Sequence, residues 1–323
     1  MAATAGSFAE RIAVVGAGVI GASWAAYFAA RGCDVVVTDP APGAHAALES
    51  MLTPQWAQLA AIGLAPGAAR ENIRFEPVLQ RAVADAEFVQ ENGPERIEIK
   101  HRIFEQLDRW TAPGTLLVTS SSGLLVSTIQ TVCRYPERVL LGHPFNPPHL
   151  IPLVEVVGGN RTGAAEVARA LAFYRAIGKM PIHLKREVPG HVANRLQAAL
   201  WREAFWLVAA GIASVEDIET AIEWGPGLRW ALLGPFVNMA LGGGSGGIRH
   251  VLEHLGPPMV DWWHDMVTPE LTASLSETII AATDAEIERR GDLFAVQRRR
   301  EEQLIALLEL KAAKVLSEHG GRR

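Results

Sequence analysis

Apolar residues in the first part of the chain form short β-branched runs, with helix-length stretches between them. Residues 12–15 are one such run, residues 19–30 are a long apolar stretch, and residues 34–38 are a second β-branched run. This order predicts a strand, a turn, a helix and a strand. Further strands are predicted over residues 88–90, 116–119, 139–141, 153–157 and 182–184. Helices are predicted between them over residues 98–110 and 164–177.

The pattern changes after Val188-Pro189-Gly190. Beyond this point every long segment has helical periodicity, namely residues 191–210, 214–224, 246–255, 270–289 and 296–318. Strands that alternate with helices are typical of a doubly wound, mostly parallel sheet. We therefore predict an α/β protein, with a Rossmann-like domain at residues 1–189 followed by an all-helical second domain at residues 190–323.

Composition narrows the class of protein. The 323 residues are 49 % hydrophobic, which is enough to fill two cores. Thirty basic and 35 acidic residues are interleaved without a basic stripe, so we expect no nucleic-acid partner. Cys33 and Cys133 are too few for a disulfide framework. With no leader pattern and no apolar run of membrane length, we expect a cytoplasmic protein without a membrane partner.

A glycine motif follows the first predicted strand. Gly16-Ala17-Gly18-Val19-Ile20-Gly21 matches G-x-G-x-x-G, and Asp39 ends the second predicted strand. In this context the glycines allow a tight turn, a close approach to a pyrophosphate and close packing of helix on strand. Asp39 would accept hydrogen bonds from the adenosine ribose and repel a 2′-phosphate. The motif predicts that the cofactor is NAD, bound by the six-residue loop and Asp39.

A second pattern is chemical. His143 stands near the end of a predicted strand, where open α/β sheets bind their ligands, and Glu155 lies within the apolar segment LVEVV. A histidine is suited to take a proton near neutral pH, and a carboxylate facing it would orient and stabilise the imidazolium. The spacing alone leaves a core histidine and an edge-exposed glutamate equally open.

Several motifs together resemble the L-3-hydroxyacyl-CoA dehydrogenase superfamily. They are GAGVIG with Asp39, QENGPE at 90–95, SSSGLL at 120–125, GHPFNPPHLIPLVEVV at 142–157 and PGHVANRLQAAL at 189–200. The resemblance covers nearly the whole chain and implies that His143 and Glu155 are a catalytic pair. It further implies that Ser122 and Asn194 hold the reacting oxygen and that Glu95 and Lys100 lie near the nicotinamide ribose. It also implies a homodimer formed through the helical domain.

Departures from the acyl-CoA enzymes indicate a branch. Pro144 follows the histidine and Ser120 stands two residues before Ser122, where those enzymes usually have an aromatic residue and an asparagine. GPGLRWALLGPF at 225–236 resembles the branch that contains L-gulonate 3-dehydrogenase, lambda-crystallin and L-carnitine dehydrogenase, and GGGSGGIRH at 242–250 favours the carnitine side. The resemblance implies NAD-dependent oxidation of a small 3-hydroxy acid to the 3-oxo acid. L-Carnitine is the first choice, with L-gulonate, a 3-hydroxyacyl-CoA or a lambda-crystallin-like structural role as alternatives.

A carnitine substrate needs a donor for its carboxylate and an aromatic surface for its quaternary ammonium. The candidates are Phe145, Trp201, Phe205, Arg229 and Trp230. Each could equally be a core or structural ion-pair residue. His250 to His254 match a metalloprotease pattern, but we expect no metal because that reaction does not fit the rest of the chain.

Overall fold

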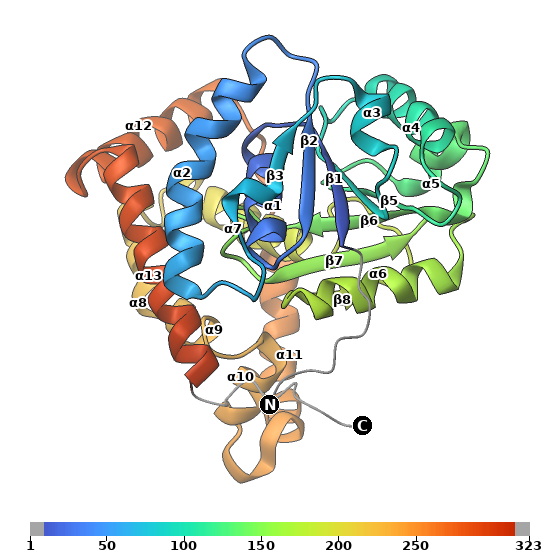
Figure 1. Ribbon diagram of the computed structural model, residues 1–323. Helices are drawn as coiled ribbons and strands as arrows, with labels where there is room; N and C mark the ends of the chain where they lie inside the picture. Colours follow the sequence, from blue (N-terminus) through green and yellow to red (C-terminus); the bar gives the residue numbers. More distant parts are fainter. Residues whose placement is uncertain (1–9, 314–323) are drawn as a thin grey trace. The chain divides into compact units, whose positions relative to one another are not determined.

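The computed structural model describes residues 10–313, whose strands form one eight-stranded sheet in the order β3-β2-β1-β4-β5-β6-β7-β8 (Figure 1). The strands are β1 (Arg11–Val15), β2 (Asp34–Thr38), β3 (Ile73–Phe75), β4 (Phe88–Glu91), β5 (Leu116–Thr119), β6 (Val139–Pro144), β7 (Leu153–Gly158) and β8 (Met180–His183). Neighbouring strands are parallel except for the antiparallel pair β6–β7. The first six strands have the order of a doubly wound dinucleotide-binding sheet. The predicted fold class is confirmed.

Helices cover both faces of the sheet. α1, α2 and α6 contribute to one core, and α3, α4 and α5 contribute to the other. They are α1 (Val19–Ala30), α2 (Ala44–Ile62), α3 (Leu79–Val83), α4 (Ile97–Trp110), α5 (Val126–Ile129) and α6 (Ala164–Ala176), with 3₁₀ turns η1 (Arg70–Asn72), η2 (Gln130–Val132) and η3 (Pro136–Arg138). Successive strand residues point to opposite faces, so Ile12 and Val14 join the first core while Ala13 and Val15 join the second.

The first core is built around α1, ten of whose twelve residues are buried. Its small residues let the helix approach the sheet closely, and its large ones form an aromatic cluster. Trp24 stacks on Phe28 with ring centroids 4.9 Å apart, and Phe28 contacts Phe88 edge-on. Such aromatic contacts add about 0.5–1.5 kcal/mol each beyond the area they bury. Burial raises the pKa of the Cys33 and Cys133 thiols to about 12, so both are uncharged at neutral pH.

Several features of the first part were not predicted, among them three that bear on its architecture. The strand expected over residues 139–141 continues to Pro144, so His143 lies inside β6. The three-residue strand β3 is too short to give a pattern. Helix α2 was missed because it contains Pro54 and has neither an N-cap side chain nor an acid in its first turn.

The chain divides into two compact units after Asn194, and the second unit is helical. Its elements are α7 (Ala193–Ala209), α8 (Val215–Trp224), α9 (Pro226–Trp230), α10 (Pro235–Gly242), η4 (Gly244–Gly246), α11 (Gly247–Asp265), α12 (Ala273–Arg289) and α13 (Leu293–Ala313). The helix predicted over 246–255 was too short, since α11 continues through Pro257 and Pro258. Residues 314–318 of the last predicted helix lie outside the described residues. No helix within residues 10–313 is long and apolar enough to cross a membrane.

Candidate active site

A buried histidine and a buried glutamate lie opposite each other on β6 and β7. The antiparallel register pairs His143 with Glu155, and His143 Nδ1 lies 2.9 Å from Glu155 Oε2. Glu155 is fully buried and His143 is 4 % exposed. Directly opposed residues of an antiparallel pair have Cβ atoms roughly 4.5–5.5 Å apart. The strand register therefore holds this pair, called the dyad below, in contact.

The start of α7 supplies further partners for the carboxylate of the dyad. Glu155 Oε1 accepts hydrogen bonds from the backbone N–H of Val192 at 2.8 Å and of Ala193 at 3.0 Å. Burial by itself raises the pKa of Glu155. The hydrogen bonds from His143, Ala193 and Val192 and the charge on His143 together lower it by more, so the pKa lies below its ordinary value. Glu155 is therefore a carboxylate at neutral pH, stabilised at a helix N-terminus.

The partners of His143 determine its tautomer. A carboxylate only accepts hydrogen bonds, so Nδ1 carries the proton of the neutral ring and the lone pair lies on Nε2. Ser122 Oγ, in the loop after β5, lies 3.1 Å from Nε2. Ser122, His143 and Glu155 thus form a line in which Nε2 is the atom able to accept a proton.

Two further residues predicted for the site are Asn194, on α7, and Phe145, directly after β6. Asn194 is half-buried and is the second residue of α7, next to the Ala193 amide that binds Glu155. Phe145 follows β6, and its ring meets that of His143 edge-on with centroids 5.3 Å apart. Phe145 therefore contacts the dyad, and the helix that carries Asn194 begins beside the dyad.

Glu95 organises the loop that carries Ser122. Its Oε1 accepts hydrogen bonds from the Ser121 hydroxyl at 2.6 Å and from the Gly123 amide at 2.8 Å. Burial raises the pKa of Glu95, but these hydrogen bonds and the charge of Lys100 lower it to below its ordinary value. A charged Glu95 is therefore fastened to the residues on both sides of Ser122.

Lys100, on α4, is fully enclosed. Its Nζ donates to both carboxylate oxygens of Glu91 at 2.9 Å and to the carbonyl of Gly93 at 3.0 Å. Glu95 Oε2 lies 3.8 Å away. The three ammonium protons thus have acceptors within the protein, so Lys100 supports Glu91 and Glu95 from behind. Its contact with the nicotinamide ribose stays a prediction.

The glycine loop leaves room for an anion. Gly16 has a φ of 95°, and a Cβ at Gly21 would lie 1.8 Å from the carbonyl oxygen of Gly16. A Cβ built at Gly18 would meet no atom within 4 Å among residues 10–313, apart from those of its neighbours in the chain. Val19 and Ile20 open α1, which among the described residues has no side-chain cap and no acid in its first turn. The first N–H groups of α1 are therefore available to a phosphate group.

Asp39 stands beside this loop. Its Oδ2 accepts a hydrogen bond from the Ala17 amide at 2.8 Å, and its Oδ1 accepts one from the Ala41 amide at 2.8 Å. The carboxylate follows the end of β2, where the ribose-binding acid of a dinucleotide fold stands. The open loop, the uncapped helix and this carboxylate fit the pyrophosphate and adenosine ribose of NAD.

Four predicted substrate residues lie in the helical unit. Trp201 and Phe205 line a groove of about 440 Å³ with residues of α8 and α12. Arg229 and Trp230 end the short helix α9 and are exposed. An α-helix rises 1.5 Å per residue, so Trp201 lies about 10 Å along α7 from Asn194. The contact of all four with a substrate stays a prediction.

The sequence did not point to His191. Its ring centroid lies 5.0 Å from that of His143, and the residue is 2 % exposed with a φ of 51°. The available signal was a histidine after a Pro-Gly pair at the start of a predicted helix, which favours a turn but names no partner. Ser121, whose carbonyl contacts His191, was not singled out because it is the middle residue of a run of three serines.

The residues of the metalloprotease pattern, on α11, contact each other. The rings of His250 and His254 lie 4.0 Å apart, and His254 Nδ1 lies 2.8 Å from the carbonyl of His250. Within the described part of the chain, no group of three or more His, Cys, Asp or Glu side chains could hold a metal ion.

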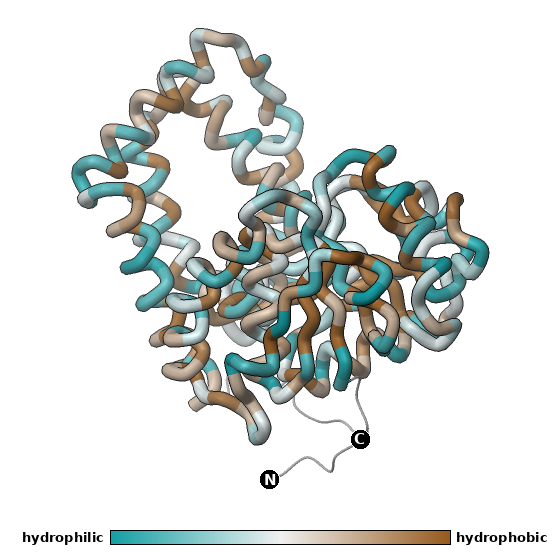
Figure 2. The backbone as a smooth tube through the Cα atoms, turned by 45° about the horizontal axis from the view of Figure 1, so that its top comes forward, coloured by the Kyte–Doolittle hydropathy of each residue, from teal (hydrophilic) through white to brown (hydrophobic). Residues whose placement is uncertain are grey.

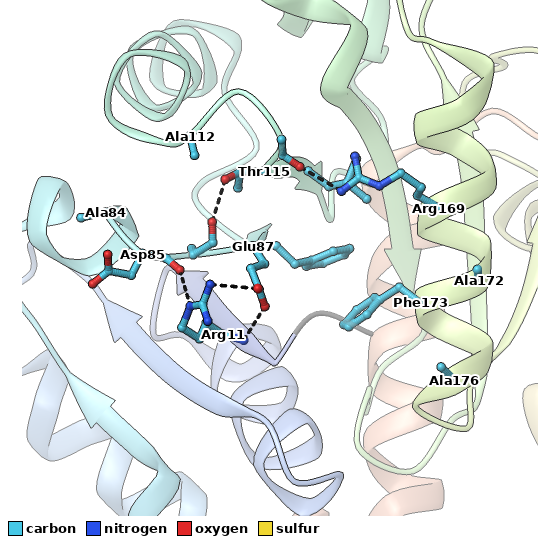
Figure 3. Close-up of a pocket in the computed structure, with 14 residues that line it drawn as sticks. Arg11, Ala84, Asp85, Glu87, Ala112, Thr115, Arg169, Ala172, Phe173 and Ala176 are labelled. Atoms are coloured by element: carbon cyan, nitrogen blue, oxygen red, sulfur yellow. Dashed lines mark hydrogen bonds and ion pairs between the residues drawn. The ribbon is translucent and has the colours of Figure 1, made fainter. Parts of the chain in front are cut away.

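A cavity of about 800 Å³ opens at the amino ends of the strands (Figure 3). Arg11 there pairs with Glu87 at 2.8 Å, and Arg169 donates to the carbonyl of Gly114 at 2.9 Å. Both arginines therefore have protein partners. Ligands of doubly wound sheets bind beyond the carboxyl ends of the strands, which is the edge where the dyad lies. We therefore place the candidate site at the dyad and not in this cavity.

Known proteins resemble the chain over most of its length. The L-carnitine dehydrogenase of Streptomyces coelicolor is 48 % identical over 292 residues, covering 90 % of this chain and 92 % of the relative. The L-carnitine dehydrogenase of Pseudomonas aeruginosa is 44 % identical, with 93 % of each chain covered. A crystal structure of 5-formyl-3-hydroxy-2-methylpyridine 4-carboxylic acid 5-dehydrogenase, described as an NAD⁺-dependent dismutase, matches with a TM-score of 0.81 at 31 % identity. It covers 93 % of this chain and 98 % of its own.

Two family models match consecutive parts of the chain. The 3-hydroxyacyl-CoA dehydrogenase NAD binding domain matches residues 11–188, and the C-terminal domain of the same family matches residues 190–274. The first match contains the glycine loop, Asp39 and the dyad. The chain therefore belongs to the 3-hydroxyacyl-CoA dehydrogenase family.

Proposed function

We propose that the protein oxidises a small 3-hydroxy acid with NAD, and that its substrate is L-carnitine, giving 3-dehydrocarnitine. The observation that carries the reaction type is the line Ser122–His143–Glu155, with distances of 3.1 and 2.9 Å between its members. The substrate is supported by relatives named L-carnitine dehydrogenase that are 40–48 % identical over at least 90 % of this chain.

The reaction removes a proton from the hydroxyl group at C3 of the substrate and a hydride from C3 itself. NAD held by the glycine loop and Asp39 would supply the acceptor for the hydride that leaves C3. His143 Nε2 takes the hydroxyl proton, because its lone pair is the acceptor left after Nδ1 binds Glu155. The imidazolium is then stabilised by the Glu155 carboxylate. The proton later leaves His143 for solvent, so that atoms and charge balance.

Ser122 and Asn194 hold the reacting oxygen as it becomes a carbonyl. Both are neutral donors, so they stabilise a developing alkoxide without changing the charge around His143. The Ser122 hydroxyl lies 3.1 Å from His143 Nε2, so a substrate oxygen held by this hydroxyl would lie beside the proton acceptor. Glu95 and Lys100 support the loop on the cofactor side.

Carnitine selection needs a cation for the carboxylate and aromatic surface for the trimethylammonium group. We assign the first to Arg229 and the second to Phe145, with Trp201, Phe205 and Trp230 as further aromatic candidates. If Arg229 binds the carboxylate, Arg229→Ala lowers kcat/KM by about 2 kcal/mol or more, the scale of a charge-assisted hydrogen bond in a desolvated site. Arg249→Ala, on exposed α11, serves as the control. Unaltered kinetics of Arg229→Ala would remove this assignment.

A spectrophotometric assay of NADH formation tests the proposal. The substrates are L-carnitine, L-gulonate, 3-hydroxybutyrate and 3-hydroxybutyryl-CoA at equal concentration. We expect L-carnitine to have the highest kcat/KM. Turnover of gulonate without carnitine would move the substrate to the polyol acid, and turnover of the thioester alone would identify an acyl-CoA enzyme. Bound NAD without turnover of any of the four would favour a lambda-crystallin-like structural role.

We also propose that the protein works as a cytoplasmic homodimer joined through its helical unit. The support is apolar surface, since Phe236 and Phe294 are 79 % and 81 % exposed. The chain has two cysteines, too few for a disulfide framework, which is consistent with a reducing compartment. Light scattering should give twice the chain mass, and Phe236→Glu with Phe294→Glu should lower it toward the monomer. A monomeric wild-type protein would contradict the dimer.

A further inference from the structure

His191 is a buried titratable group at the dyad that the proposed reaction does not use. Its Nε2 lies 3.1 Å from the carbonyl oxygen of Ser121. Its Nδ1 is buried and has no hydrogen-bond partner among residues 10–313. The ring is tilted by 49° to that of His143, with centroids 5.0 Å apart. A polar atom enclosed without a partner costs free energy, so its presence here calls for a role.

The backbone of His191 contributes to the same site. Its φ of 51° lies in the left-handed region, which histidine adopts more readily than most residues. Its N–H donates to the carbonyl of Val188 at 3.0 Å, closing the turn before α7. The next two amides, of Val192 and Ala193, are the ones that bind Glu155. The turn at His191 therefore directs these two amides at the dyad.

The side chain of His191 contacts the Ser122 end of the line Ser122–His143–Glu155. Ser121 directly precedes Ser122, whose hydroxyl lies 3.1 Å from His143 Nε2. A hydrogen bond to the Ser121 carbonyl restrains the peptide plane from which Ser122 projects. His191 therefore touches both supports of the line, the amides that hold Glu155 and the peptide that carries Ser122.

The partners of His191 also determine which of its ring nitrogens carries the proton. A carbonyl only accepts hydrogen bonds, so Nε2 carries the hydrogen and Nδ1 keeps an unprotonated lone pair. A second proton at Nδ1 would bury an N–H group without an acceptor beside His143. Burial lowers the pKa of His191 below its ordinary value, as does the charge on His143, while the Ser121 hydrogen bond, Glu155 and Glu95 oppose this effect without cancelling it.

We propose that His191 is a positioning residue for the reaction. As the neutral Nε2–H tautomer it holds the Ser121 carbonyl, and so fixes the Ser122 hydroxyl against His143. Because it stays neutral, the proton released by the substrate resides on His143 alone. This inference rests on the proposed function and adds a residue to its machinery.

Two variants separate the hydrogen bond from the shape of the ring. His191→Gln keeps an amide N–H donor near the place of Nε2 and cannot titrate. His191→Phe keeps a planar ring and loses the donor. Both side chains are unbranched at Cβ, so both meet the same cost in the left-handed backbone. NADH binding, followed by fluorescence, checks that each variant retains a folded cofactor site.

The kinetic comparison uses the substrate that the wild-type protein turns over fastest. We expect His191→Phe to lower kcat about tenfold with KM for NAD unchanged, the scale of one lost hydrogen bond of about 1.4 kcal/mol. His191→Gln should stay within about threefold of wild type and keep its pH profile of kcat/KM. A wild-type kcat for His191→Phe, or equal losses in both variants, would overturn the positioning role. Absence of turnover by the wild-type protein would instead count against the proposed function.

Nuclear magnetic resonance of protein labelled with ¹⁵N-histidine tests the tautomer without turnover. The His191 signals are those that vanish in His191→Gln. We expect the neutral Nε2–H pattern between about pH 5.5 and 8, a range in which an ordinary histidine titrates. An imidazolium or an Nδ1–H tautomer at neutral pH would overturn the inference even if the kinetics agreed.

Discussion

The sheet unit and the helical unit differ in how they treat their apolar residues. The sheet unit buries them in two continuous clusters, one on each face of the sheet. Within residues 195–313, by contrast, the buried apolar side chains are those of Val251 and Leu275, which are still 5 % and 9 % exposed. Figure 2 shows apolar residues gathered along the strands and alternating with polar ones along the helices. The sheet unit completes its core from its own chain, whereas the helical unit presents apolar surface that a partner could cover.

Charged groups follow the same division. The sheet unit encloses Lys100 with Glu91, and His143 with Glu155. The pair Arg249–Glu253 in the helical unit is exposed, with 85 % and 59 % of the two side chains accessible. Buried charges are kept only where every partner is in place. The comparison therefore predicts that the loss of a buried ion pair lowers the stability of the first unit, whereas the loss of an exposed pair hardly changes stability in the second.

The largest expected effect is on stability. Lys100→Met leaves Glu91 buried without its counter-charge and should lower the free energy of unfolding by about 3–5 kcal/mol. Urea denaturation measures it on the transition that NADH shifts to higher urea. Arg249→Met, which breaks the exposed pair of α11, should leave the same transition where it is. Similar losses from the two variants would end the contrast between the units.

Next in size is the effect on turnover. His143→Gln should lower kcat at least ~10²-fold, the usual scale for a lost general base, because no other group takes the hydroxyl proton. NADH binding should be unchanged, since the glycine loop is intact. His250→Gln, on α11, is the matched control and should behave like wild type. Full activity of His143→Gln would show that the dyad is structural.

Cofactor selectivity should depend on the sheet unit and not on the helical unit, and the expected effect is smaller than the one on turnover. The wild-type protein should prefer NAD over NADP by at least ~10-fold in kcat/KM, because the Asp39 carboxylate repels a 2′-phosphate. Asp39→Asn keeps an acceptor for the Ala17 amide and removes the charge, so it should reduce this ratio. Arg229→Ala should leave the ratio unaltered while it weakens use of the hydroxy acid. Equal use of both cofactors by the wild-type protein would mean that Asp39 does not face the ribose.

The smallest effect concerns stability in acid. The pKa of Glu155 in the folded protein lies below its ordinary value, so the unfolded chain takes up a proton first as the pH falls. The stability that Glu155 contributes is present above the ordinary carboxyl pKa of about 4.3 and is lost as pH falls through the lower folded-state pKa. Thermal unfolding of Glu155→Gln should therefore depend less on pH, between about pH 6 and 3, than that of the wild type. Glu302→Gln, exposed on α13, should keep the wild-type slope.

Local pattern was sufficient for much of the sheet unit. Residues 34–38 and 116–119 were predicted as strands with the bounds that β2 and β5 have. The glycine loop could be predicted because a strand, a tight turn and a helix follow each other within a few residues. Phe236 and Phe294 could not be predicted to be exposed, because their helices have apolar periodicity whether or not a partner covers them.

The sequence by itself determined the alternation of most strands with helices, the glycine loop and the presence of a lone histidine and a lone glutamate in apolar strands. These are local properties, set by residues close together in the chain. The tertiary structure alone decided that β7 runs antiparallel to β6 in the register that sets His143 opposite Glu155. It also brought the amides of Val192 and Ala193 to that carboxylate and the ring of His191 to the Ser121 carbonyl. Such contacts join residues 37 to 70 positions apart. Only the packing of the whole sheet unit, and no local preference, can bring them together.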